Sequence, residues 1–245
     1  MAPVLLVQGV RARRSIPRLP DADGPTSGST GDPAQALRLV VIGESTVAGV
    51  GAPDHGSALT GQVARTLAHL TGRPVTWRAL GQTGATATDV RASLAPLLAG
   101  DRADAVVIAL GVNDTKDLRS VARWRRDLTA LVVEVRGYVG VDVPVVLGGV
   151  PPLHAFPALP PALRGFLGSR AELLDRASRE LAASTHGLAH VPTPIEELTE
   201  TGFASDGFHP SAEGYAIWGR HLAAAVAGLL AGQPDRTTMD GRTSQ

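Results

Sequence analysis

The sequence contains no cysteine. Disulfide bonds, thiolate metal ligands and a cysteine nucleophile are therefore excluded within these 245 residues, whatever the redox state of the surroundings. Aromatic residues are also scarce, at 4% of the chain, which leaves little material for a stacking platform that would hold a long sugar. A polysaccharide is therefore a poor candidate ligand.

An excess of charge and a long hydrophobic run are also missing. Lys plus Arg equals Asp plus Glu at 23 each, so nothing drives the chain toward nucleic acid. No segment approaches the roughly 18 uninterrupted apolar residues that a bilayer-spanning helix needs. The apolar start, Met1 to Val10, precedes Arg11, Arg13 and Arg14, the reverse of the charge order in a signal peptide. We expect a cytoplasmic protein; the same order also fits an N-terminus that lies on a membrane surface.

The composition that is present predicts one α/β domain with extensions. With 44% hydrophobic residues, a chain of this length can bury one substantial core. Residues 17–33 (PRLPDADGPTSGSTGDP) are rich in Pro, Gly, Ser and Asp, which is typical of a linker or an extended strap. The expected division is an N-terminal extension and linker over 1–36, the domain over 37–232 and a disordered tail over 233–245.

Strand-like and helix-like segments alternate along the domain. Short apolar runs bounded by Gly or Pro predict five strands: LRLVVIG (37–43), PVTWRALG (74–81), ADAVVIALG (103–111), VPVVLGGV (143–150) and GLAHVP (187–192). Helical spacing of apolar residues falls between them, at Leu59 to Leu70, Val90 to Leu98 and Leu128 to Val135, and a last helix is expected from Ser211 to about Leu230. This order predicts a three-layer α/β/α sandwich around a five-stranded parallel sheet.

Four loops should meet at the carboxyl edge of that sheet, where open parallel sheets bind their ligands. They are GESTVAG (43–49), GQTGAT (81–86), GVND (111–114) and DGFHPS (206–211). Ser45 is expected at a strand-to-helix turn that exposes its hydroxyl, with its own N–H assisted by the helix dipole. Taken alone, Ser45 is more typical of a helix cap.

Asp206 and His209 stand three residues apart in a tight turn. The carboxylate can therefore hold one imidazole nitrogen and leave the other free to face a hydroxyl. Asn113 offers a side-chain N–H, and Gly84 offers a backbone N–H without a Cβ beside it. With the Ser45 N–H they could form an oxyanion hole. Each residue alone has a structural explanation, but their conjunction at one sheet edge favours acyl-transfer chemistry.

These four segments resemble the conserved blocks of the SGNH (GDSL-like) hydrolase family, whose members include esterases, lipases, thioesterases and carbohydrate deacetylases. The resemblance covers about residues 37–230. It implies Ser45 as nucleophile, Asp206 and His209 as the other triad members, and Ser45, Gly84 and Asn113 as the oxyanion hole. The sequence departs from the family pattern at Glu44, where the family usually has Asp. That change puts the hydrogen bonding beside the nucleophile in question.

The resemblance implies a serine esterase that acts on small to medium acyl esters through an acyl-enzyme and needs no cofactor. Activity should rise with pH as His209 loses its proton. An acyltransferase or a carbohydrate O-deacetylase would use the same triad, and the sequence does not separate these from an esterase. A nucleotide-binding domain is disfavoured because neither G-x-G-x-x-G nor a P-loop motif is present.

Two further segments have two interpretations each. Residues 149–168 (GVPPLHAFPALPPALRGFLG) are rich in Pro, Leu and Phe, so they could line an acyl pocket or form a rigid apolar lid. A metal site is disfavoured among the seven histidines, because only His186 and His190 have a ligand-like spacing. That pair is interpreted as a surface pair.

Overall fold

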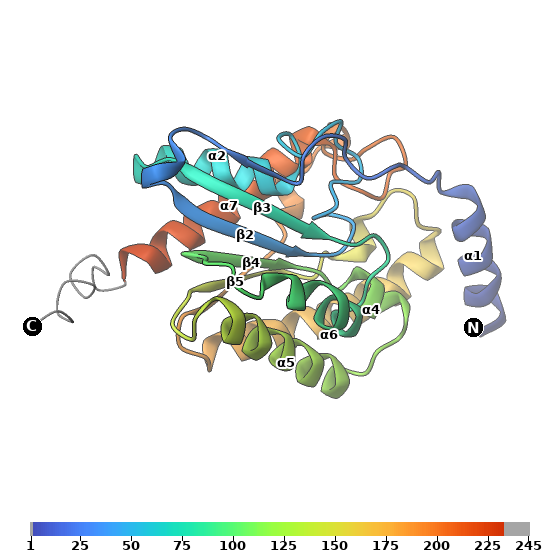
Figure 1. The fold of residues 1–245 in the computed structure, drawn as a ribbon. Coiled ribbons are helices and arrows are strands. Elements are labelled where there is room, and N and C mark those ends of the chain that lie inside the picture. The colour runs from blue at the N-terminus through green and yellow to red at the C-terminus, as the bar shows by residue number, and fades with distance from the viewer. Residues whose placement is uncertain (1, 233–245) are drawn as a thin grey trace, which may run out of the picture.

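The protein is described by a computed structural model over residues 2–232 (Figure 1). The predicted disordered tail over 233–245 lies outside the described residues. The first helix, α1 (Ala2–Ser15), stands apart from the sheet near the ends of its strand arrows, and an extended segment leads from it to the sheet (Figure 1).

All five predicted parallel strands are present. They are β2 (Leu37–Gly43), β3 (Val75–Gly81), β4 (Ala105–Ala109), β5 (Val145–Gly148) and β6 (Leu188–Val191). The order across the sheet is β1-β3-β2-β4-β5-β6. The prediction of five strands needs one correction, because a sixth strand, β1 (Ser27–Ser29), pairs antiparallel with β3.

β1 comes from the segment that was interpreted as a linker or an extended strap. Its sequence, Ser-Gly-Ser, carries no hydrophobic alternation, so a pattern search cannot find it. It forms because the outer edge of β3 offers unpaired backbone groups: the Ala79 N–H donates to Thr26 O at 2.7 Å and the Thr30 N–H to Val75 O at 3.0 Å. Gly28 also lets the strand lie flat against the Trp77 ring.

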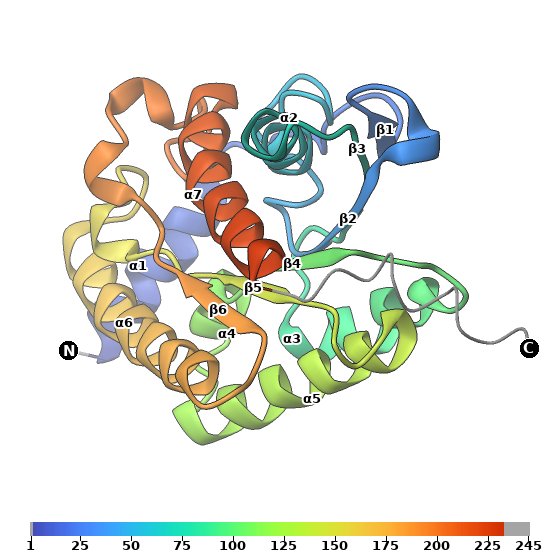
Figure 2. The ribbon, with the colours of Figure 1, turned by 90° about the vertical axis from the view of Figure 1, so that its left-hand side faces the viewer.

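Helices cover both faces of the sheet (Figure 2). One face is packed by α2 (Leu59–Thr71) and α7 (Ala212–Ala231), and the other by α5 (Val121–Val139) and α6 (Pro161–Ala183). Side chains of β2 alternate between the two cores, Leu39 and Val41 facing one and Val40 and Ile42 the other. The predicted three-layer α/β/α sandwich is therefore confirmed.

The remaining elements are short. They are α3 (Ala87–Asp89), α4 (Val112–Lys116), a π-helical turn η2 (Val90–Leu94) and 3₁₀ turns η1 (Pro33–Gln35), η3 (Ala95–Leu98), η4 (Leu153–Ala155), η5 (Ile195–Glu197) and η6 (Glu200–Gly202). The segment predicted as a helix over Val90 to Leu98 is therefore helical, but it passes from a π-helical turn into a 3₁₀ turn and is not a regular α-helix. Pro96 lacks the N–H that an α-helix would need there.

The segment 149–168 is only partly a loop. Its last eight residues begin α6, with Pro161 in the first helical turn, where proline is tolerated. The apolar residues Leu163 and Leu167 in this part point into the core with helical spacing. The connection at the active-site edge therefore ends where α6 starts.

Candidate active site

The four predicted loops meet at the carboxyl edge of the sheet, where β2, β3 and β4 run in parallel. Ser45 follows β2 directly, but not as the cap of a helix. The Val50 N–H donates to Ser45 O at 3.0 Å and the Val47 N–H to Glu44 O at 2.9 Å, which forms a succession of turns, and α2 begins only at Leu59. The expected assistance from a helix dipole at Ser45 is therefore wrong.

A chain of hydrogen bonds joins Ser45, His209 and Asp206. His209 Nε2 lies 3.1 Å from Ser45 Oγ, and His209 Nδ1 lies 2.6 Å from Asp206 Oδ2. The Asp206 side chain is fully buried, whereas His209 retains 18% exposure. The hydroxyl thus faces a ring nitrogen whose opposite nitrogen is fixed by a carboxylate, an arrangement that can pass one proton from oxygen to nitrogen.

Close backbone packing holds the serine loop against the histidine loop. Gly51 has φ of +96°, and a Cβ there would lie 2.3 Å from Pro210 O and 3.4 Å from the His209 Cβ. Only glycine fits both the conformation and the space. Tyr215, at the start of α7, adds a hydrogen bond from its hydroxyl to Val50 O at 2.7 Å. The distance between Ser45 and His209 is therefore set by rigid packing.

The carboxylate of Asp206 is held in its charged form. Burial works to raise its pKa, but hydrogen bonds from the His209 ring and from the backbone N–H groups of His209 and Phe208 outweigh burial, so the pKa lies below its ordinary value. The two backbone N–H groups each donate to Oδ1 at 2.9 Å. Oδ2 is thereby left to the imidazole, and Asp206 stays ionised at neutral pH.

Two of the three predicted oxyanion donors are free within the described chain. The backbone N–H groups of Ser45 and Gly84 donate to no group of residues 2–232. Gly84 has φ of +87°, a left-handed conformation that favours glycine, and its Cβ position is open space. A substrate oxygen could therefore approach this part of the backbone closely.

The third predicted donor, Asn113, is already engaged. Its Nδ2 group donates to Glu44 Oε2 and, at 3.2 Å, to Ala85 O. Lys116 Nζ donates to Asn113 Oδ1 at 2.9 Å, which opposes an inverted amide because Nδ2 would then face the ammonium group. Asn113 can therefore serve an oxyanion only by sharing or releasing one of these hydrogens.

Glu44, the residue at which the sequence departs from the family pattern, has a structural role beside Ser45. Its carboxylate is buried, and it accepts the backbone N–H groups of Val112 at 3.0 Å and Asn113 at 3.2 Å besides the Asn113 amide. Burial raises the pKa of Glu44 to about 7, against the opposing effect of these backbone hydrogen bonds and of nearby Lys116. The longer acid therefore ties the serine loop to the loop that carries Asn113.

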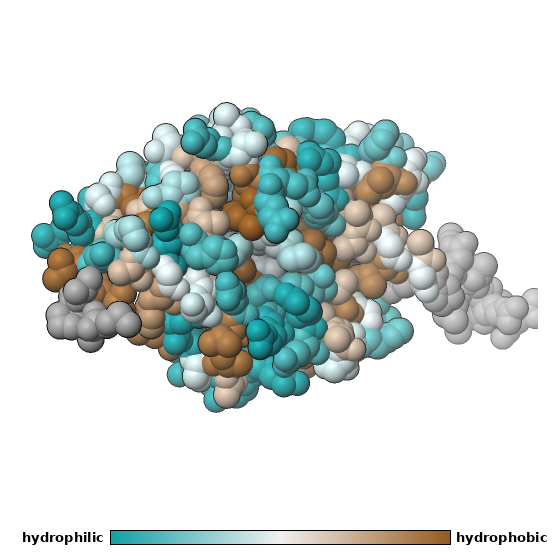
Figure 3. Space-filling model, turned by 180° about the vertical axis from the view of Figure 1, so that it is seen from behind, coloured by the Kyte–Doolittle hydropathy of each residue, from teal (hydrophilic) through white to brown (hydrophobic). Residues whose placement is uncertain are grey.

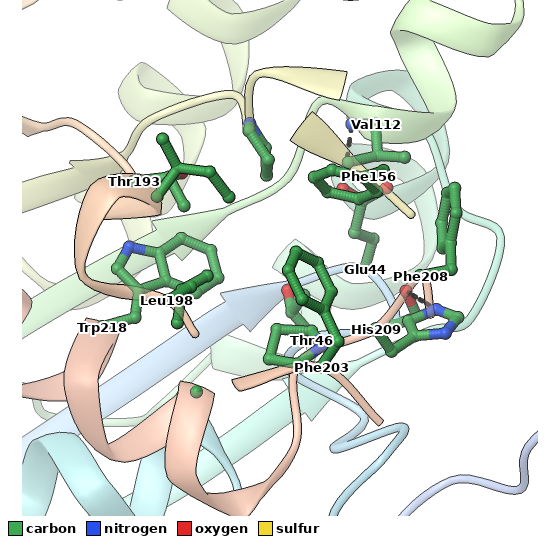
Figure 4. A pocket seen from close by; sticks show the side chains of 15 residues that line it. Glu44, Thr46, Val112, Phe156, Thr193, Leu198, Phe203, Phe208, His209 and Trp218 are labelled. Atoms are coloured by element: carbon green, nitrogen blue, oxygen red, sulfur yellow. Dashed lines mark hydrogen bonds between the residues drawn. The ribbon is translucent and has the colours of Figure 1, made fainter. Parts of the chain in front are cut away.

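A narrow apolar cavity of about 30 Å³ opens beside Ser45 and His209 (Figure 4). Its walls come from the serine loop, from the connection after β5, from the segment after β6 and from α7; they include Pro151, Phe156, Thr193, Leu198, Phe203, Phe208 and Trp218. Three of these rings meet edge to face, with Phe156 5.7 Å from Phe203 and 5.2 Å from Phe208 between centroids. Only Pro151 and Phe156 lie in the segment for which an acyl pocket was one interpretation.

Sequence reasoning missed the contributors to this cavity that lie outside the four loops and outside residues 149–168. Among them, Trp218 carries no chemical motif, because it lies on a helix whose apolar spacing indicates only a core face. Lys116 could have been noticed from its position three residues after Asn113, which places both side chains on one face of a helical turn. No sequence signal joins Trp218 to the serine loop.

The interpretation of His186 and His190 as a surface pair holds for His186, which is exposed, but not for His190. His190 is 4% exposed, and its Nε2 lies 2.7 Å from Asp175 Oδ1 on α6. Asp175 also accepts the Val150 N–H at 2.9 Å and pairs with Arg179, and its pKa is lowered because these hydrogen bonds outweigh burial. Within residues 2–232, no group of three potential ligands stands ready for a metal ion.

Comparisons with known proteins agree with the geometry. The sequence profile of the GDSL-like lipase/acylhydrolase family matches residues 41–217. The GDSL-like esterase Rv1075c of Mycobacterium tuberculosis is 30% identical over 231 residues, which cover 87% of this chain and 73% of that protein.

Two solved structures share the fold. A lipase/acylhydrolase from Enterococcus faecalis aligns with a TM-score of 0.63 and 24% identity, covering 78% of this chain and 96% of its own. An acetyl xylan esterase from Geobacillus stearothermophilus aligns with a TM-score of 0.56 and 20% identity, covering 78% and 95%. At these identities the two structures show the fold alone. The family profile and the curated relative go further: the chain belongs to the GDSL-like lipase/acylhydrolase family and is a hydrolase that acts on esters.

Proposed function

We propose that the protein hydrolyses esters of short acyl groups through an acyl-enzyme on Ser45. One observation carries the proposal: the hydrogen-bond series from Ser45 through His209 to Asp206 borders an apolar cavity. A nucleophile, its base and a place for the acyl group therefore lie together.

The proposed reaction has two half-reactions. Ser45 Oγ attacks the ester carbonyl carbon while His209 Nε2 takes its proton, and His209 then returns that proton to the leaving alcohol. In the second half, His209 takes a proton from water, whose oxygen attacks the acyl carbon, and the proton passes to Ser45 Oγ as the acid departs. Asp206 remains ionised throughout and keeps the ring oriented, in keeping with its lowered pKa.

Charge on the tetrahedral intermediate needs hydrogen-bond donors. The unpaired backbone N–H groups of Ser45 and Gly84 are the first candidates, because they lose no protein partner when they bind the oxyanion. Asn113 is the third, by sharing the hydrogen that Nδ2 now donates to Ala85 O. Glu44 would act as a positioning residue that holds Asn113.

The cavity favours the short end of the predicted range of acyl groups. A single water-sized sphere needs roughly 10–15 Å³ of such space. A volume of about 30 Å³ therefore admits an acyl tail of about two or three non-hydrogen atoms without movement of the walls. Longer chains would have to displace the phenylalanine rings.

Turnover of p-nitrophenyl esters from acetate to octanoate, measured on wild type and Ser45→Ala, tests the proposal. We expect a kcat/KM optimum at two to four carbons and a loss of at least about 10³-fold in the variant. Turnover that survives in Ser45→Ala would overturn the assignment. Adding a candidate acceptor alcohol separates an esterase, which forms free acid, from an acyltransferase, which forms a new ester.

We also propose that α1 contacts an anionic lipid surface. Gln8 fixes the helix to the domain by accepting the Leu163 N–H at 2.9 Å, and Ala12 is buried. Val7 and Val10 are left 66% and 45% exposed on the other side. They border a surface hollow together with two arginines and a serine, Arg11, Arg14 and Ser15.

Apolar and cationic side chains on one helix face suit the boundary of a membrane that carries negative headgroups. Teal and brown side chains adjoin at the left of Figure 3, the side on which α1 lies. None of the described helices is long and apolar enough to cross a bilayer.

Sedimentation with phosphatidylglycerol-containing vesicles tests the contact. The double variant Arg11→Glu, Arg14→Glu should lose binding, whereas Arg73→Glu with Arg102→Glu, which changes the same charge at two other exposed positions, should keep it. Equal binding by both variants would contradict the proposal. No binding by the wild type would contradict it as well.

A further inference from the structure

Residues 21–26 cross the connection between β2 and α2, which begins with the serine loop. We call these residues the N-terminal strap; they belong to the extended segment that follows α1 (Figure 1). The Ala22 N–H donates to Ala48 O at 3.0 Å. Further along the connection, the His55 N–H donates to Asp23 O at 3.1 Å. The strap is therefore attached to this connection through its main chain.

Close packing adds to this attachment. Gly49, four residues after Ser45, has φ of +79°, and a Cβ there would lie 2.5 Å from the Ala22 Cβ. A larger residue at position 49 would push the strap away, and the left-handed conformation also favours glycine. A parallel bridge between Asp23 and Asp54 continues the contact. The packing therefore sets the place of the strap relative to Ser45.

The first side chain of the strap reaches a second loop of the site. Thr83 Oγ1 donates to Asp21 Oδ1 at 2.6 Å, a length that is usual for a hydroxyl bonded to a carboxylate. Thr83 directly precedes Gly84, whose backbone N–H is a proposed oxyanion donor. The peptide unit that carries this donor is therefore bonded to the strap through the Thr83 side chain.

The hydrogen bond to Asp21 is the single tether at the tip of this loop. The Ala85 N–H donates to Gln82 O at 3.1 Å, so residues 82–85 form a β-turn with Thr83 and Gly84 at its tip. Both tip residues are exposed, and their backbone N–H and C=O groups bond to no group of residues 2–232. Without Asp21, nothing in this part of the chain would hold the tip in place.

The two ends of the turn are fixed independently of the strap. The Gln82 N–H donates to Gly43 O at 3.1 Å, at the end of β2. Ala85 O accepts the Asn113 amide at 3.2 Å. Loss of the bond to Asp21 should therefore displace the tip of the turn and leave its attachment to the sheet intact.

We propose that Asp21 is a positioning residue for ester hydrolysis, which acts through Thr83 to hold the Gly84 N–H in place. One segment, the N-terminal strap, thereby spans the loop of the nucleophile and the loop of the donor. A donor stabilises the oxyanion only at about 2.7–3.1 Å from the developing charge, so a small displacement of the turn weakens it. The inference rests on the proposed function, because it takes Ser45 as nucleophile and Gly84 as donor.

Kinetics with p-nitrophenyl acetate test the proposal. Asp21→Ala and Thr83→Val each remove one partner of the bond, and each should lower kcat by about 10-fold while KM stays within about 2-fold. The loss falls on kcat because the oxyanion exists only in the transition state and the intermediate. The double variant should lose no more than either single variant, since the same bond is already broken. Thr83→Ser retains a hydroxyl and should restore most of kcat.

Asp32→Ala is the matched control. Asp32 is another exposed acid of the N-terminal segment, and its Oδ1 accepts the Ala34 N–H at 3.0 Å without touching the glycine loop. The substitution removes the same charge from the same segment, so kcat should stay within about 2-fold of wild type. Thermal melts of the Asp21 and Asp32 variants show whether any loss of activity follows from unfolding.

Binding of phenylboronic acid gives a measurement that needs no turnover. This compound forms a tetrahedral adduct with an activated serine, so its affinity reports the stabilisation of a transition-state-like group. Asp21→Ala should weaken its binding by about 10-fold, in parallel with kcat, whereas Asp32→Ala should leave it unchanged.

Three results would overturn the inference. They are an unchanged kcat in Asp21→Ala, an effect on KM alone, and a loss in the double variant equal to the product of the single losses. If Ser45→Ala loses turnover and Asp21→Ala keeps it, the inference fails while the proposed function stands. If Ser45→Ala keeps its turnover, the proposed function fails and the inference fails with it, because Gly84 then has no acyl-enzyme to serve.

Discussion

Two aspartate–histidine pairs lie in this molecule with nearly the same hydrogen-bond distance. His209 Nδ1 lies 2.6 Å from Asp206 Oδ2, and His190 Nε2 lies 2.7 Å from Asp175 Oδ1. In both pairs the pKa of the carboxyl group is lowered, because hydrogen bonds outweigh burial. The difference is the second nitrogen of the ring: Nε2 of His209 faces Ser45 Oγ at 3.1 Å at a cavity wall, whereas Nδ1 of His190 bonds to no hydroxyl within residues 2–232.

An imidazole held by a carboxylate therefore has a structural role in both pairs and a possible catalytic role in only one. Asp175 joins α6 to the ends of β5 and β6 through the Val150 N–H and His190. Asp206 organises its own turn through two backbone N–H groups. Only the pair that also faces a nucleophile and a cavity can take part in catalysis.

Matched substitutions of the two acids should have opposite consequences. Asp206→Asn presents an amide to His209 and stabilises the wrong tautomer, so kcat should fall by about 10⁴-fold with little change in melting temperature. Asp175→Asn should keep kcat within about 2-fold and lower the free energy of unfolding by about 1 kcal/mol, because it weakens the interactions with His190 and Arg179. Ester kinetics and thermal melts of both variants provide the measurement.

A loss of kcat in Asp175→Asn as large as that in Asp206→Asn would contradict the distinction between a structural pair, Asp175 with His190, and a catalytic pair, Asp206 with His209. The double variant is a further check. The change in its melting temperature should equal the sum of the two single changes, because the pairs share no hydrogen-bond partner within residues 2–232.

Substitutions of Glu44, the residue before Ser45, should lower kcat less than Asp206→Asn does. Glu44→Gln turns an NH₂ group toward donors that need an acceptor, so Asn113 should shift and kcat should fall by about 10–100-fold. Glu44→Asp keeps the carboxylate and should lose less than about 5-fold. Equal loss in the two variants would mean that side-chain length, and not charge, positions Asn113.

The dependence of stability on pH should be the smallest effect. Burial raises the pKa of Glu44 to about 7 and that of Asp114 to about 6. The stability that these two groups contribute is present below their ordinary pKa values and is lost as pH rises through 6 to 7. The lowered pKa values of Asp206 and Asp175 act in the opposite sense, since their contribution is lost as pH falls toward and below their ordinary range.

Melting temperature should therefore be highest near about pH 5. Differential scanning calorimetry at one-unit steps from pH 4 to 8 measures it. A melting temperature that rises steadily from pH 5 to 8 would contradict the assignment of Glu44 and Asp114 as acids whose pKa burial raises.

The sequence predicted the layers because β2 to β6 are apolar runs bounded by Gly and Pro, and such runs report burial on both faces. It did not predict β1, because Ser27–Ser29 is added by backbone hydrogen bonds that carry no side-chain signal. The segment expected as a helix over Val90 to Leu98 is helical, but its π-helical and 3₁₀ geometry was not predicted, because hydrophobic spacing does not show the effect of Pro96.

The sequence predicted those residues of the candidate site that belong to a recognisable motif. Ser45, Asp206 and His209 come together because loops after parallel strands share one edge. The engagement of Asn113 by Glu44, and the presence of Trp218 at the cavity, depend on side-chain packing between distant segments. No spacing in one sequence records such contacts.

Labelling with a fluorophosphonate, followed by peptide mapping, tests the central claim most directly. Such a reagent modifies a serine only where a base activates the hydroxyl. We expect one modified residue, Ser45, with labelling lost in Ser45→Ala, strongly slowed in Asp206→Asn and unchanged in Asp175→Asn. Modification of another serine, or undiminished labelling of Ser45→Ala, would contradict the account.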